Sequence, residues 1–63
     1  MKRRALLDQL AKIARDRGEK LEFVREGGSH DLYRVGSTPI AVGRHADIPE
    51  MTARRILKNA KKP

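Results

Sequence analysis

Apolar residues near the start of the chain recur every three to four positions. This spacing puts them on one side of a helix, while Asp8 and Lys12 pair on the other side. Gly18 follows the last periodic position, and glycine commonly ends helices. The pattern predicts a first helix over residues 3 to 17, with an apolar stripe made of Leu6, Leu7, Leu10, Ile13 and Ala14.

Two short runs rich in β-branched and aromatic residues follow, at residues 21 to 26 and 31 to 35. Gly27-Gly28-Ser29 lies between them, and we expect its glycines to supply the positive φ angles of a tight reversal. The two runs therefore predict a β-hairpin.

A third strand is predicted over residues 38 to 42, after a second turn signal at Gly36-Ser37. Pro39 cannot donate a ladder hydrogen bond, so it belongs at a strand start or at a sheet edge. The middle of the chain is thus expected to form a three-stranded antiparallel meander.

A second helix is predicted over residues 48 to 60. Asp47 is followed three residues later by Glu50, with Pro49 expected in the first turn, which is typical of a helix start. The apolar residues beyond it repeat at helical spacing: Ala53, Ile56, Leu57 and Ala60.

Both helices have to cover one face of the sheet if the chain is to bury a core. The expected fold class is therefore α+β, in the order α-β-β-β-α, with the opposite face of the antiparallel sheet open to solvent or a partner. Leu10 and Ile56 are expected in the core. Because 63 residues suffice for one small domain, we expect a single domain over residues 1 to 63, with any site near the surface.

The chain has no cysteine and no cluster of His and acidic residues, so neither a disulfide nor a metal site is predicted. No apolar run approaches the roughly 20 residues of a membrane span, and no signal-peptide core precedes the first helix. We expect a cytosolic protein that needs no cofactor and has no membrane partner.

The net charge of +7 is concentrated at the two ends of the chain. Such a distribution attracts polyanions, which favours nucleic acid first, an acidic protein second and anionic lipid last. Arg54, Lys58, Lys61 and Lys62 form a basic stripe on the second helix, although cations there also interact favourably with the helix dipole. Phe23 and Tyr33 are the only aromatic residues, which argues against modules that stack several bases on exposed rings.

His30 is the residue most suited to chemistry, since it follows the glycine turn. Imidazole has a reference pKa near 6.5, so it can accept the proton of a ribose 2′-hydroxyl or donate one to a departing 5′-oxygen. Taken alone, a histidine beside a turn is more often a solvated bystander. Gly28 has no Cβ and leaves room for an RNA backbone, and Ser29 either donates to a phosphate or closes the turn.

Three further side chains each have two roles that fit. His45 is either a second acid/base group or a structural residue that caps the second helix or holds Asp47, and the structural role is favoured. Arg44 is suited to a forked phosphate contact, with an ion pair to Asp47 or Glu50 as the alternative. Tyr33 either stacks on a base, orients His30 through its hydroxyl, or packs in the protein. Packing is favoured, because strand alternation puts Tyr33 on the face opposite His30.

Four segments that together span nearly the whole chain form a recognisable set: Met1-Lys2-Arg3-Arg4 with Leu6-Leu7, Gly28-Ser29-His30-x-x-Tyr33-Arg34, Arg44-His45, and Ile56-Leu57-Lys58. With the order of elements, these segments resemble the HicA-type toxins, small mRNA interferases of bacterial toxin-antitoxin systems. The departures are Gly43, where the family often has a proline, and the absence of the Gly-Trp pair common after the first helix.

The resemblance implies a fold like that of double-stranded-RNA-binding domains and a metal-independent mRNA endoribonuclease with His30 as the catalytic residue. It also implies a cognate antitoxin resembling HicB that covers the His30 region. Arg54 and Lys58 are then expected to hold RNA phosphates, together with Gly28, Ser29 and Arg44. Two alternatives stay open: a non-catalytic basic RNA-binding module, and a basic adaptor domain that binds an acidic protein.

Overall fold

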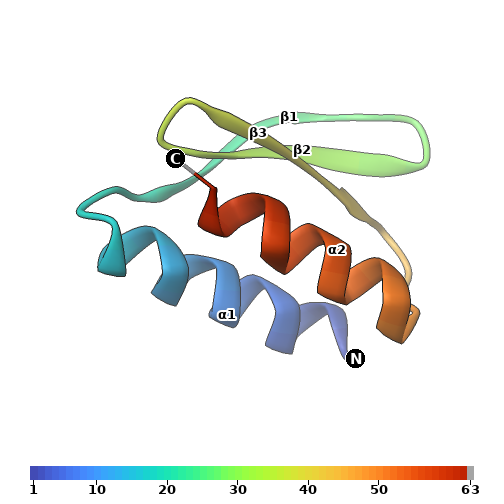
Figure 1. The fold of residues 1–63 in the computed structure, drawn as a ribbon. Helices are drawn as coiled ribbons and strands as arrows, with labels where there is room; N and C mark the ends of the chain where they lie inside the picture. Colours follow the sequence, from blue (N-terminus) through green and yellow to red (C-terminus); the bar gives the residue numbers. More distant parts are fainter. Residues whose placement is uncertain (63) are drawn as a thin grey trace.

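The computed structural model describes residues 1–62 and contains two helices and one sheet in the expected order. Both helices lie beneath one face of the sheet, and the other face is open (Figure 1). This confirms the predicted α+β arrangement; Pro63, the last residue of the predicted domain, lies outside the described residues. The elements are α1 (Arg3–Asp16), β1 (Leu21–Glu26), β2 (His30–Val35), β3 (Thr38–Gly43) and α2 (Glu50–Lys61).

The three strands pair antiparallel in the order β1-β2-β3. Val35 is buried and faces the helices, so strand alternation puts Tyr33 and Asp31 on the same inner face. His30, Leu32 and Arg34 therefore lie on the outer face. Every residue of β2 from His30 to Val35 has a partner on β3, whereas β1 is interrupted by a register shift at Val24, a β-bulge.

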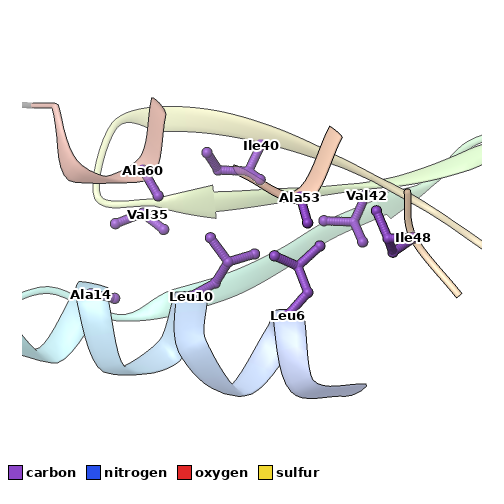
Figure 2. Packing of buried hydrophobic residues seen from close by; sticks show 9 residues of the cluster. All are labelled: Leu6, Leu10, Ala14, Val35, Ile40, Val42, Ile48, Ala53 and Ala60. Atoms are coloured by element: carbon purple, nitrogen blue, oxygen red, sulfur yellow. The ribbon is translucent and has the colours of Figure 1, made fainter. Parts of the chain in front are cut away.

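The core lies between the helices and the sheet (Figure 2). Leu6 and Leu10 of α1 are fully buried and point toward Val35 and Val42 of the sheet. The buried residues of α2 are small, Ala53 and Ala60, which lets this helix pack close to β3 and α1. Leu10 is in the core as predicted, whereas Ile56 is only half-buried, because it packs at the border of the core while the alanines occupy its centre.

The two helices run in the same direction, so both begin at the end of the molecule that holds the β1–β2 turn (Figure 1). We call this the hairpin end, formed by residues 1–4, 27–31 and 43–50. Its segments are tied by the backbone bonds from Arg3 N to Ala46 O (2.8 Å) and from Ile48 N to Met1 O (2.7 Å). At the far end, Arg17 Nη1 donates to Ala60 O at 2.6 Å.

Left-handed glycines close two of the turns. Gly18 has φ 72°, and Gly18 N and Glu19 N donate to Arg15 O and Ala14 O, which is a Schellman motif that ends α1. Gly36 has φ 59° at the first position of the two-residue β2–β3 turn, as in a type II′ hairpin.

Positive φ angles were expected in the β1–β2 turn, and this prediction is wrong. Neither Gly27 nor Gly28 has a positive φ. Gly27 is required for a different reason, because a Cβ there would collide with the carbonyl oxygen of His30. The turn therefore reverses by close approach of two backbone segments.

The predicted start of the second helix also needs correction. Pro49 is the N-cap residue of α2, and no side chain caps this helix. Asp47 instead pairs with Lys2 across an isolated β-bridge, with 3.2 Å between Asp47 Oδ1 and Lys2 Nζ. Asp47 does not reach the helix start because the chain before α2 runs beside the chain before α1.

Across residues 1–62, no helix combines the length and the apolar character needed to traverse a lipid bilayer.

Candidate functional site

His30 is the first residue of β2 and its side chain is exposed. Its partner on β3 is Gly43, so no neighbouring side chain from β3 covers the imidazole. Ser29 Oγ lies 3.3 Å from His30 Nδ1 and is the hydrogen-bonding partner found for this ring among residues 1–62. The imidazole is thus accessible on the open sheet face, at the end of the central strand, where it can exchange a proton with a bound molecule.

Asp31, the next residue, points to the inner face, where a carboxylate needs cations around it. Both of its oxygens are paired: Oδ1 lies 3.0 Å from Arg44 Nε, and Oδ2 lies 2.9 Å from Arg3 Nη2. Arg3 Nε also donates to Gly43 O at 2.8 Å. One carboxylate therefore joins the first turn of α1 to β2 and to the chain after β3.

Arg44 completes this group through a second ion pair, with 2.7 Å between its Nη2 and Glu26 Oε1. We refer to Arg3, Glu26, Asp31 and Arg44 as the Asp31 cluster. The hydrogen bond to Asp31, opposed by desolvation and supported by the charges of Asp31 and Glu26, raises the pKa of the Arg44 guanidinium above its ordinary value. Arg44 therefore keeps its positive charge. It follows Gly43, the β3 partner of His30, and its guanidinium lies with Asp31 and Glu26 at the same end of the sheet.

The alternative role considered for Arg44 was an ion pair with Asp47 or Glu50, and Arg44 is instead paired with Glu26 and Asp31. Asp47 binds Lys2, and Glu50 lies near the amino group of Met1 and near Arg54. The hairpin brings Glu26 and Asp31 opposite each other, at the position that Arg44 reaches from the end of β3. Sequence reasoning missed Arg3, Glu26 and Asp31 as parts of the site.

His45 is exposed and forms no hydrogen bond or ion pair with the described part of the chain. The favoured structural roles are therefore not observed, because Lys2 holds Asp47 and α2 has no side-chain cap. A role as second acid/base group stays a prediction. Tyr33 packs edge-on against Phe23, with 5.4 Å between ring centroids, on the face opposite His30, as expected for a packing residue.

Gly28 and Ser29 are exposed at the tip of the hairpin, next to His30. A Cβ at Gly28 would meet no atom within 4 Å, so this glycine is not required by the protein's own packing. The free space above it is open to a ligand.

Positive charge is segregated into the helical layer. Residues 2–17 hold six Lys/Arg against two acids and residues 50–62 hold five against one, whereas residues 18–49 hold four against five. Arg54 is exposed one turn into α2, with Glu50 Oε2 3.8 Å from its Nε, and Lys58 is exposed one turn further. Arg55 is also exposed on α2. The predicted basic stripe did not include it, because a stripe that begins at Arg54 continues in steps of three or four residues.

The structure gathers Gly28, Ser29, His30, Arg44 and His45 at the hairpin end, but it does not bring Lys58 to them. Lys58 follows Glu50 by eight residues, which is about 12 Å along a helix, and lies toward the far end. Two other cations, Arg25 and Arg34, share the outer sheet face with His30, as their pairing register shows.

Two hollows on the surface do not border His30. One of about 650 Å³ lies beside the first turn of α1, between residues 2–8 and Ala46, and one of about 310 Å³ separates Lys12 from Lys61 between the helices. Among residues 1–62, no group of three or more His, Asp and Glu side chains is placed to hold a metal ion.

No family model, curated protein or solved structure matches this chain.

Proposed function

We propose that this chain is the toxin of a type II toxin-antitoxin system, resembling the HicA-type mRNA interferases, and that it cleaves mRNA without a metal. The observation that carries the proposal is an exposed imidazole, His30, one residue from a carboxylate that holds Arg44 in place. Cleavage of a phosphodiester requires an acid/base group and is favoured by a fixed cation that binds the phosphate, and both are found at the hairpin end.

The proposed chemistry uses three side chains at the hairpin end. His30 accepts the proton of the ribose 2′-hydroxyl or donates one to the departing 5′-oxygen. Arg44 binds the phosphate oxygens, since a guanidinium is charged at every working pH and offers a fork of N–H donors. Ser29, 3.3 Å from His30 Nδ1, orients the ring or donates to the phosphate. His45 is the candidate for the second proton transfer.

The partner proposed for this toxin is an antitoxin resembling HicB that covers the His30 region. Its contact surface is expected to carry acidic or polar groups opposite Arg44 and the basic helices, so the complex should be tighter at low salt. Action on mRNA places the proposed activity in the cytoplasm.

A second candidate function, a non-catalytic RNA-binding module, is favoured by the position of the positive charge. Most Lys and Arg residues lie in the helical layer, and Lys58 is remote from His30. A surface of this kind binds RNA phosphates without any need for an imidazole.

The test is cleavage of a defined mRNA in EDTA by the wild type and by His30→Ala, with Tyr33→Phe as a control on the opposite sheet face. We expect His30→Ala to bind RNA normally and to cleave about 10²- to 10⁴-fold more slowly, the usual contribution of a general acid or base. Equal rates would remove His30 from the mechanism, and wild-type activity lost on chelation would require a metal.

The same assay separates the two candidate functions. RNA that is bound with salt-dependent affinity but left intact by the wild type would identify the binding module. A His45→Ala variant, measured alongside, shows whether one imidazole or two take part, because loss of a second acid/base group lowers the rate without abolishing RNA binding.

A further inference from the structure

Arg44 is held by two carboxylates in very different surroundings. Asp31 is 14% exposed and shares its second oxygen with Arg3, so its position is fixed from two sides. Glu26 is 75% exposed and contacts Arg44 through Oε1. An exposed ion pair of that kind is weak, whereas a half-buried carboxylate with two arginine partners is firmly held.

The two carboxylates also contact different nitrogen atoms of the guanidinium. Asp31 takes Nε, and Glu26 takes Nη2 at 2.7 Å. Arg44 is itself 41% exposed, so the edge that faces Glu26 can be reached from solvent. A phosphate presents oxygens of the same charge and hydrogen-bonding character as a carboxylate, and it binds the same kind of guanidinium edge.

We infer that Glu26 occupies the phosphate-binding edge of Arg44 in the free protein and that an RNA phosphodiester displaces it, while Asp31 keeps Arg44 in place. The inference rests on the proposed function for the class of ligand. Glu26 faces Asp31 across the hairpin. A phosphate that replaces the Glu26 carboxylate therefore lies near Asp31, the residue that follows His30.

One consequence is that removal of the Glu26 charge should strengthen RNA binding. The bound phosphate no longer has to break an ion pair or approach a carboxylate of like charge. Because exposed ion pairs are weak, we expect Glu26→Gln to tighten RNA binding about two- to fivefold at physiological salt. The gain has to depend on Arg44.

Glu22 provides a matched control on the same strand. Glu22 is also exposed and paired with an arginine, with 3.5 Å between Glu22 Oε1 and Arg34 Nη2. Glu22→Gln removes the same charge at a point roughly 10 Å along the sheet from Glu26, since the pairing register separates their partners Arg34 and Asp31 by three residues. That separation exceeds the screening length of about 8 Å at physiological ionic strength, so Glu22→Gln reports the effect of removing one charge and releasing one exposed arginine away from Arg44.

The experiment measures the Kd of fluorescently labelled 2′-O-methyl RNA, which lacks the 2′-hydroxyl and cannot be cleaved. The variants are Glu26→Gln, Glu22→Gln, Arg44→Gln and the double variant Glu26→Gln/Arg44→Gln. The inference requires that Glu26→Gln binds about two- to fivefold more tightly than the wild type and than Glu22→Gln, and that this gain disappears in the double variant. If Arg44→Gln does not fold, Arg44→Lys replaces it, because lysine keeps the charge without the fork.

Three results would overturn the inference: equal tightening by Glu22→Gln, no tightening by Glu26→Gln, or a gain that persists without the Arg44 guanidinium. Its outcome is independent of the cleavage assay. His30-dependent cleavage with no gain from Glu26→Gln rejects this inference and keeps the proposed function. An Arg44-dependent gain in a protein that cleaves no RNA rejects the nuclease and keeps Glu26 as the group that phosphate displaces.

Discussion

Arg3 and Asp31 connect the first turn of α1 to the strand that begins with His30, with 2.9 Å between Arg3 Nη2 and Asp31 Oδ2. The two residues are 28 positions apart in sequence, and both side chains are mostly buried. Because Arg3 also donates to Gly43 O, it fixes the ends of two strands relative to one helix. The Asp31 cluster therefore helps to fix the end of the strand that carries His30.

Asp31→Asn should lower the free energy of unfolding by about 1.5–3 kcal/mol, the usual range for hydrogen bonds to charged groups. The substitution keeps the shape of the side chain but leaves the Arg3 guanidinium without its counter-charge. Urea denaturation followed by circular dichroism measures the change. Glu22→Gln, which breaks an exposed pair, should cost no more than about 1 kcal/mol. Equal costs for the two variants would show that Asp31 carries no special share of the stability.

Gly27→Ala and Gly28→Ala should differ sharply although the residues are neighbours. The Gly27 variant places a Cβ against the His30 carbonyl oxygen, so the hairpin has to shift and thermal stability should fall. The Gly28 variant meets open space without a positive φ, so its free energy of unfolding should stay within about 0.5 kcal/mol of the wild type.

The same Gly28→Ala variant tests the predicted approach of RNA to the turn. If an RNA backbone lies against Gly28, the added methyl group should weaken the binding of uncleavable RNA while the fold is unchanged. Unchanged affinity in a folded Gly28→Ala protein would remove Gly28 from the RNA-binding residues.

The elements were predictable to within about two residues, because periodicity and turn glycines act locally. Leu6, Leu10 and Ala14 repeat at helical spacing and are all buried, and Gly18 ends α1 as expected. The incorrect details depend on contacts between distant segments. Asp47 does not cap α2 because Lys2, 45 residues earlier in the chain, takes its carboxylate.

The candidate site was predictable only in part, for the same reason. His30 and Arg44 were identified from residue type and position, but the partners of Arg44 depend on how the hairpin folds against β3. One signal was present in the sequence: alternation places Asp31 on the inner face with Tyr33 and Val35. A carboxylate at an inward position requires cations nearby, so the strand pattern by itself indicates an arginine or lysine partner for Asp31.

Leu10→Ala should destabilise the protein by about 2–5 kcal/mol, because Leu10 is fully buried between α1 and the sheet. A domain of this size is expected to have little stability to spare, so the variant should melt at a much lower temperature or fail to fold. Ile56→Ala should cost less, since Ile56 is only half-buried. A Leu10→Ala protein that melts like the wild type would contradict the assigned core.

The salt dependence of RNA binding should locate the RNA on the helices or on the open sheet face. Replacing Arg54 and Lys58 by Ala should flatten the slope of log K against log salt by about one to two units, at roughly 0.7–0.9 per phosphate contact. Replacing Arg25 and Arg34 by Ala removes the same charge from the face that bears His30. A flatter slope only in the second variant would place the RNA on the sheet and contradict the predicted role of Arg54 and Lys58.

The contribution of Arg44 to RNA binding should not change with pH. The hydrogen bond to Asp31 raises the pKa of Arg44, and a guanidinium is already fully protonated at every pH at which RNA binding is measured. A cation with a raised pKa keeps its ion pairs below its ordinary value and loses them only as the pH rises past the raised one. The ratio of Kd between Arg44→Gln and the wild type, measured with 2′-O-methyl RNA, should therefore be equal at about pH 6 and about pH 9.

The cleavage rate should behave differently, because a reaction that depends on imidazole varies with pH near neutrality. Binding that is level in pH together with a rate that is not would assign the proton transfer to a histidine and the phosphate contact to Arg44. An Arg44-dependent affinity that falls between about pH 6 and pH 9 would mean that another titrating group controls the contact.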